Sequence, residues 1–279
     1  MGGSAVQDQV AYWSGEPGQR WADNQAHIDA ALRDILDKLL AFADVQSGDE
    51  VLDIGCGAGA TTIACAPRAA PGRVVGVDIS EPLLAVARRR VADAGLHNVD
   101  LILADAASHD FEPARFGRVI SRLGVMFFPD PPAAFANIRR AMRSGARLAF
   151  VCFRTFAEVP AFAVSYEAAK PLLPPQAPSD PDAPGPFAFA RAERVRSILS
   201  QAGFADITIE PAEATLRSGP LEEAVQSALT LGPLARALTG AGEDVRSQVA
   251  EAVSKALVPY DGSEGVTLPA GIWLVGARA

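Results

Sequence analysis

The chain has 279 residues, of which 49% are hydrophobic and 21% charged, so it can bury one large core and is not a disordered protein. Acidic residues outnumber basic ones by 33 to 25, and the net charge of −8 argues against a nucleic-acid partner. The N-terminus lacks a signal pattern, and no apolar run approaches the length of a membrane span. The three cysteines lack metal-ligand spacing, so we expect a reduced, cytoplasmic protein with no metal site and no membrane span.

Helices and strands alternate along the first half of the chain. Apolar residues at helical spacing over 26–43 predict an amphipathic helix that precedes a buried strand, Val51–Ile54. A short helix broken by Pro67 and Pro71 is expected next, followed by a strand over 73–77 and a helix from Ser80 to Gly95. Strands over 99–104 and 118–121 come after it. A helix opened by Asp130 and closed by Gly145 then leads to a strand over 147–153. This rhythm predicts an α/β, doubly wound, mostly parallel sheet with helices on both faces.

The alternation stops after Phe153. A short helix over 159–173 leads into a proline-rich stretch, 174–186, which is too long for an ordinary connection and is expected to be a lid or an exposed excursion. The pattern then resumes with a helix over 191–202, a strand over 207–211, helices over 221–238 and 243–258, and a last strand over 272–277.

Three glycines on alternate positions follow the first strand directly. Gly55, Gly57 and Gly59 allow a tight turn into the next helix and let a ligand lie on main-chain N–H groups. Asp78 ends the second strand, 19 residues after the last glycine, where an acid can bind the hydroxyls of a ribose. The segment is therefore expected to bind a compound that contains adenosine.

Two more acids decide which adenosine compound is expected. Asp53 lies inside the first strand and Asp105 follows the third, so with Asp78 they fall near the carboxyl ends of three strands. Carboxylates suit an ammonium group, a ribose diol and an exocyclic amine, but they repel a pyrophosphate. This favours S-adenosylmethionine. The alternative is NAD(P), because Gly55, Gly57 and Ala60 weakly meet the dinucleotide pattern.

Six segments in order resemble the class I S-adenosylmethionine-dependent methyltransferases, in the small-molecule branch of the ubiquinone and menaquinone type. The resemblance covers roughly residues 45–210. It implies a single domain with a Rossmann-like, seven-stranded sheet and a reversed edge strand. The domain would consist of an N-terminal helical lid (1–44), a cofactor-binding half (45–153), a lid or insertion (154–190) and the rest of the sheet (191–279). The matching segments are Val51-Leu-Asp-Ile-Gly-Cys-Gly-Ala-Gly-Ala-Thr61, Val75-Gly-Val-Asp-Ile-Ser80, Leu103-Ala-Asp-Ala106, Phe116–Phe128, Arg143–Phe150 and Ala202-Gly-Phe204.

These motifs predict specific contacts with the cofactor. The loop of Gly55, Cys56, Gly57 and Gly59 is expected to cradle the methionine end, and Asp78 to accept from both ribose hydroxyls. Ile79 is expected to pack on the adenine, while Asp105 and the N–H of Ala106 bind its edge. Asp53 either pairs with the cofactor's ammonium or fixes the loop through its N–H groups.

Two further regions are expected to border the cleft. Ser121 and Arg122 leave the fourth strand toward it, where Arg122 meets either the cofactor carboxylate or an acid on the substrate, or else only caps the strand. In a resembling family, a segment like 12–21 folds over the cofactor, so Tyr12, Trp13, Arg20 and Trp21 are lid or substrate contacts, or cap the core from outside. Four aromatic residues line an acceptor pocket or, as the safer interpretation, form a packing stripe: Phe153, Phe156, Phe162 and Tyr166.

The sequence offers no convincing general base. The candidates for a catalytic role are His109, Arg122 and Tyr12, of which His109 is the histidine nearest the expected cleft. We expect an S-adenosylmethionine-dependent methyltransferase that acts by in-line transfer on a small, apolar or aromatic organic acceptor, as a monomer or a homodimer. The alternatives are an NAD(P)-dependent oxidoreductase and a cofactor-binding module without catalysis.

Overall fold

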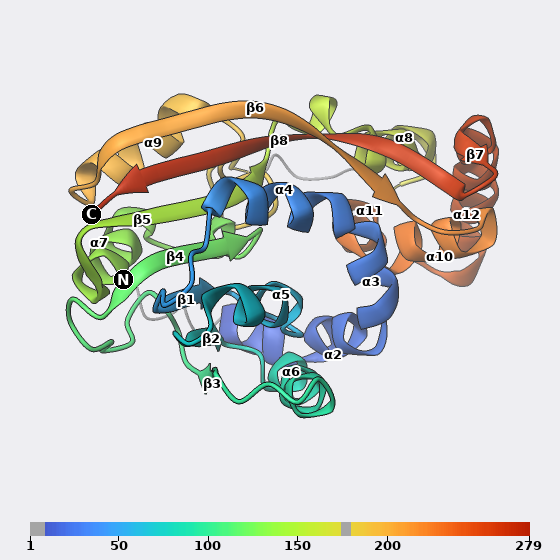
Figure 1. Cartoon of the computed structure of the whole chain (residues 1–279). Coiled ribbons are helices and arrows are strands. Elements are labelled where there is room, and N and C mark those ends of the chain that lie inside the picture. The colour runs from blue at the N-terminus through green and yellow to red at the C-terminus, as the bar shows by residue number, and fades with distance from the viewer. Residues whose placement is uncertain (1–8, 174–179) are drawn as a thin grey trace.

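The computed structural model describes residues 9–173 and 180–279, so part of the expected lid (1–8) and part of the proline-rich stretch (174–179) lie outside the described residues. Seven strands form one sheet in the order β3-β2-β1-β4-β5-β8-β6, which confirms the expected Rossmann-like fold (Figure 1). The strands are β1 (Val51–Ile54), β2 (Val74–Asp78), β3 (Val99–Leu103), β4 (Phe116–Arg122), β5 (Met142–Phe153), β6 (Ala205–Arg217) and β8 (Gly265–Arg278).

The reversed strand is β8, which lies one position in from the edge. It pairs antiparallel with β5 on one side and with β6 on the other, whereas β1 to β5 pair in parallel. A two-residue strand, β7 (Asp261–Gly262), pairs with the start of β8. The last two strands along the chain were expected over 207–211 and 272–277 only, but β6 and β8 are long and extend well beyond the other strands (Figure 1).

Helices cover both faces of the sheet, as expected. Two residues of β5 whose side chains lie on opposite faces of the sheet show this. Phe150 packs against Phe135 of α7 (Pro131–Ala141), and Arg147 lies over the ring of Phe42 in α4 (Arg33–Ala43). On the first face α7 also packs on α9 (Ala192–Gln201). Next to the glycine loop, α5 (Ala60–Ala69) and α6 (Glu81–Asp93) pack on β2 and β3.

Three expected boundaries were wrong. The helix over 26–43 is two helices, α3 (Gln25–Ala31) and α4, because the backbone turns at Leu32. Pro67 does not break α5: it lies in the last turn and removes one helical N–H, but buried Cys65, Ala66 and Ala69 hold the helix in place. Gly145 does not close α7, which ends at Ala141; positive-φ Gly145 belongs to β5.

A second hydrophobic core lies beyond the end of the sheet. It is formed by α8 (Pro160–Ala169), α10 (Leu221–Thr230), α11 (Gly232–Ala237) and α12 (Glu243–Leu257) around the far end of β8. Two pieces of the chain that are distant in sequence, 160–172 and 221–257, thus meet in one helical cluster (Figure 1). None of the helices in the described part of the chain is long and apolar enough to cross a membrane.

Candidate active site

The glycine loop adopts the backbone that its sequence predicts. Gly55, Gly57 and Gly59 have φ of 66°, 54° and 84°, a region that other residues avoid. A side chain on Gly55 would lie 2.9 Å from the Cα of Gly124, so the strand end and the loop after β4 approach too closely for any larger residue. Gly59 serves packing instead, since its Cβ position lies 3.1 Å from Ala87 of α6 and it does not line the cavity described below.

Asp78 accepts hydrogen bonds both from the glycine loop and from the residue that caps the following helix, α6. Its Oδ2 accepts from the N–H of Gly57 at 2.7 Å and its Oδ1 from the N–H of Ser80 at 2.9 Å. Burial raises the pKa of Asp78, and these backbone donors oppose the shift. Because a carboxylate has about four acceptor positions, two remain for a ligand.

Asp105 lies at the end of β3 in a similar turn. Its Oδ1 accepts from the N–H of Ala107 at 2.9 Å and its Oδ2 from the hydroxyl of Ser108 at 3.0 Å. Asp105 and Ala106 both border the same cavity as Asp78 and Ile79. The structure therefore brings together these predicted residues from two separate strand ends.

Asp53 and Ser121 lie beneath the loop and do not line the cavity. Asp53 accepts from the Thr62 hydroxyl at 2.6 Å, and its buried Oδ1 has no partner within the described residues. Burial raises the pKa of Asp53 to about 7. Ser121 donates to the carbonyl of Ile54 at 2.7 Å and accepts from the N–H of Gly124, so it ties β1 to the loop after β4.

Arg122 enters the cavity next to an acid that the sequence analysis missed. Asp29 of α3 lies between two guanidinium groups, 3.4 Å from Nη2 of Arg122 and 2.7 Å from Nη2 of Arg90. Nη1 of Arg122 is buried and has no partner within the described residues, and burial lowers the pKa of this guanidinium. Nη1 of Arg122 therefore needs an acceptor that the described residues do not supply.

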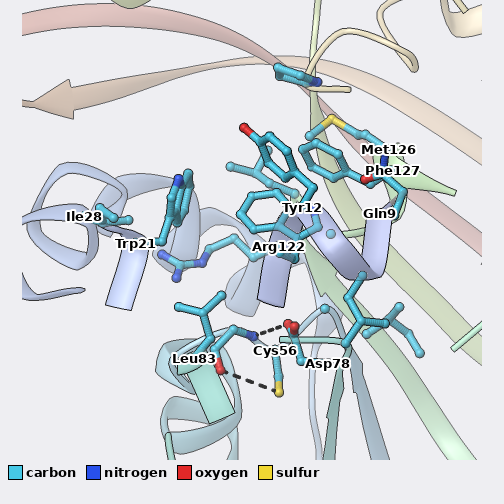
Figure 2. Close-up of a pocket in the computed structure, with 18 of the residues that line it drawn as sticks. Gln9, Tyr12, Trp21, Ile28, Cys56, Asp78, Leu83, Arg122, Met126 and Phe127 are labelled. Atoms are coloured by element: carbon cyan, nitrogen blue, oxygen red, sulfur yellow. Dashed lines mark hydrogen bonds between the residues drawn. The ribbon is translucent and has the colours of Figure 1, made fainter. Parts of the chain in front are cut away.

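The N-terminal segment covers this end of the cavity. Ser80 donates to the carbonyl of Trp13 at 2.6 Å, and Ser14 donates to the carbonyl of Ile79 at 3.2 Å. The ring of Trp13 packs edge-on against the rings of Tyr12, Trp21 and Phe127. Figure 2 shows Tyr12 and Trp21 above Cys56 of the glycine loop and Asp78 at the end of β2.

Asp78, Asp105 and Arg122 border one cavity of about 690 Å³, together with the aromatic residues of the N-terminal segment. At one end lie the glycine loop and the ends of β2, β3 and β4; at the other lie the helical cluster and the segment before α9. This second end is mostly aromatic, and the four aromatic residues expected as a pocket or a packing stripe serve both purposes, because they border the cavity and pack on one another or on Phe187.

Histidine is absent from the described wall of the cavity. His109, the candidate base, packs against Phe111 outside it. Tyr12 and Arg122 do border the cavity. The sequence analysis missed Asp29, Gln25 and Arg236, whose helices are remote in sequence from the glycine motif and carry no motif of their own.

Comparisons with known proteins find methyltransferases that are similar to part of this chain. Residues 51–145 match a family model described as a methyltransferase domain. The chain is 36% identical to nocamycin O-methyltransferase of Saccharothrix syringae over 42% of each chain, and 28% identical to demethylmenaquinone methyltransferase of Staphylococcus saprophyticus over 62% of this chain and 77% of that one. The central part of the chain, residues 51–145, is therefore similar to the methyltransferase domain of small-molecule methyltransferases.

The fold of this chain is also found in solved structures. The crystal structure of the YcgJ protein from Bacillus subtilis superposes with a TM-score of 0.57 at 17% identity, over 87% of this chain and 97% of that one. The chain spans about half the length of the curated relatives that it matches at 33–36% identity. The match to a methyltransferase domain favours S-adenosylmethionine over the NAD(P) alternative.

Proposed function

We propose that this protein transfers a methyl group from S-adenosylmethionine to a small, mostly apolar organic acceptor. The observation that carries the proposal is that one continuous cavity is bordered both by the acids at the strand ends and by an aromatic wall. A site of this shape can hold two small molecules end to end, with their reacting groups meeting between the two walls.

The residues at the strand ends fit the cofactor. Asp78 would accept from the ribose hydroxyls with its two remaining acceptor positions, and Ile79 would pack on the adenine. Asp105 and the N–H of Ala106 would bind the adenine edge. The unpartnered Nη1 of Arg122 supports a contact with the cofactor's carboxylate, because a buried guanidinium donor needs an acceptor.

The acceptor end is suited to an aromatic or polycyclic molecule. Phe153, Phe156, Phe162 and Phe187 form most of this wall, and Met126 borders it. Two relatives are named for methylation of nocamycin and of demethylmenaquinone, which are organic small molecules. The aromatic wall supports an acceptor of that kind.

The chemistry needed from the chain is mainly positioning. When bound, the cofactor supplies an electrophilic methyl group on a sulfonium. The residues of this chain orient the acceptor for an in-line approach and exclude water, with Trp13 and Trp21 covering the site from the N-terminal segment. Positioning alone can lower a barrier by about 7–11 kcal/mol in favourable cases.

The first experiment measures thermal unfolding with S-adenosylmethionine, S-adenosylhomocysteine, NAD and NADP in parallel. A ligand at 100 times its Kd stabilises a protein by about 2.7 kcal/mol. We expect a shift with the two adenosyl compounds alone; a shift with the nicotinamide compounds alone would overturn the proposal. Release of S-adenosylhomocysteine in the presence of quinol and polyketide acceptors then separates an enzyme from a binding module, which would bind but never turn over.

A further inference from the structure

Arg236 brings a positive charge to the cavity wall where the helical cluster meets Tyr12 of the N-terminal segment. It belongs to α11, and Gly232, Pro233 and Ala237 of the same segment also border the cavity. The described acids of the cavity wall are Asp29, Asp78 and Asp105, which lie in α3 and at the ends of β2 and β3. The aromatic end thus has a cation and no carboxylate within its described wall.

The guanidinium of Arg236 is held by a ring rather than by an acid. It lies over Tyr12 with its central carbon 5.8 Å from the ring centroid. Within residues 9–173 and 180–279, no carboxylate lies within ion-pair distance of Arg236. This contact with Tyr12 uses none of the guanidinium N–H groups in a hydrogen bond, so they can donate to a ligand.

The described wall of the cavity has no histidine, which bears on the kind of acceptor the site can use. An acceptor that had to lose a proton before attack would need a base. An acceptor whose oxygen is already ionised at neutral pH needs none; it needs a cation that holds the anion in place. Arg236 meets that need, because a guanidinium binds a carboxylate or an ionised enol or phenol with paired hydrogen bonds.

We propose that Arg236 determines acceptor specificity by binding an anionic oxygen, so that the acceptors of this enzyme are aromatic or polycyclic organic acids. This inference rests on the proposed function and narrows its acceptor class. Arg236 orients the acid group, and the phenylalanine wall binds the ring system.

The test compares aromatic carboxylic acids of one, two and three fused rings with their neutral carboxamides. Binding is measured by calorimetry to the full-length protein saturated with S-adenosylhomocysteine. We expect the wild-type protein to bind the best acid about ten- to a hundredfold more tightly than its amide, the range for a charge-assisted hydrogen bond. Arg236→Gln should abolish that preference, and Arg236→Lys should keep part of it.

The matched control is Arg89→Gln, which removes an exposed arginine of α6 outside the cavity wall and lowers the net charge equally. It should keep the full preference for the acid. Equal binding of acid and amide, no binding of any acid up to millimolar concentration, or an unchanged preference in Arg236→Gln would each overturn the proposal. Failure of S-adenosylhomocysteine to bind would instead refute the proposed function, so the two failures are distinguishable.

Discussion

Individual carboxylates in this site differ in what satisfies them. Asp78 accepts from two backbone N–H groups and borders the cavity, whereas Asp53 lies beneath the loop with one oxygen on Thr62 and the other without a described partner. Both pKa values are raised by burial. The same residue type therefore borders the cavity in one position and places a titratable buried group beneath the loop in the other.

Asp78→Ala should weaken cofactor binding. If Asp78 accepts from the ribose hydroxyls, the loss of charge-assisted hydrogen bonds should cost about 1.5–3 kcal/mol, measured by calorimetry with S-adenosylhomocysteine. Circular dichroism checks that the fold is retained, because the N–H groups of Gly57 and Ser80 also lose an acceptor. Unchanged affinity would refute the ribose assignment.

Asp53 should make stability fall as the pH rises. Its folded-state pKa of about 7 exceeds the ordinary value of 3.8, so between these values the folded protein binds more protons than the unfolded chain. The free energy of unfolding should therefore decrease from pH 4 to pH 7, by up to about 1.4 kcal/mol per pH unit where the difference is one proton.

Asp53→Asn should remove this part of the slope, which urea unfolding at several pH values measures. Asp110→Asn, at an aspartate with a side chain 96% exposed, is the control that should keep the slope. A slope that is the same in Asp53→Asn and in the wild-type protein would show that Asp53 titrates alike in both states.

Among the elements, α2 (Glu16–Asp23) decides whether the cofactor end is covered. Gly18 of this helix lies so close to the preceding segment that an added Cβ would be 1.7 Å from the carbonyl oxygen of Trp13 and 3.0 Å from the hydroxyl of Ser80. The close approach lets Ser80 bind the carbonyl of Trp13 and fixes the aromatic cover over the loop.

Gly18→Ala should therefore displace the N-terminal segment from the site. We expect a loss of about 1–3 kcal/mol, as for overpacking, that appears mainly in cofactor binding. The control is Gly242→Ala, where nothing lies within 4 Å of the added Cβ. Similar cofactor affinity in both variants would mean that the segment does not need this close contact.

At the scale of the whole molecule, the cavity lies between two hydrophobic cores. The sheet and its helices form the first, and the helical cluster around α12 forms the second. Leu238, which is fully buried in the second core, follows directly after α11 and so supports Arg236. Packing in the cluster should therefore control the acceptor end more than the cofactor end.

Leu238→Ala should destabilise the helical cluster by about 2–5 kcal/mol. We expect faster amide hydrogen exchange in α10 to α12 and weaker binding of aromatic acids, with cofactor affinity unchanged. Val258→Ala, at a side chain 56% exposed, should change stability by less than about 0.5 kcal/mol. Equal acceleration of exchange throughout the sheet would instead indicate that both cores unfold as one unit.

The sequence by itself determined the sheet, the glycine loop and the acids at its strand ends. These features depend on local rules: alternating buried strands and helices, glycines at positive φ, and parallel strands whose carboxyl ends meet at one edge. Asp78 and Asp105 could be placed in this way because Asp78 ends a strand and Asp105 lies two residues after the end of another.

Only the tertiary structure decided the rest of the cavity. The contact of Asp29 with Arg122 joins α3 to β4. The contact of Arg236 with the ring of Tyr12 joins α11 to the N-terminal segment. No periodicity or motif in one sequence encodes such pairs, because the contacts arise from how whole helices pack rather than from their neighbours along the chain. The sequence therefore determined where the cofactor is expected to bind, and packing determined what closes over it.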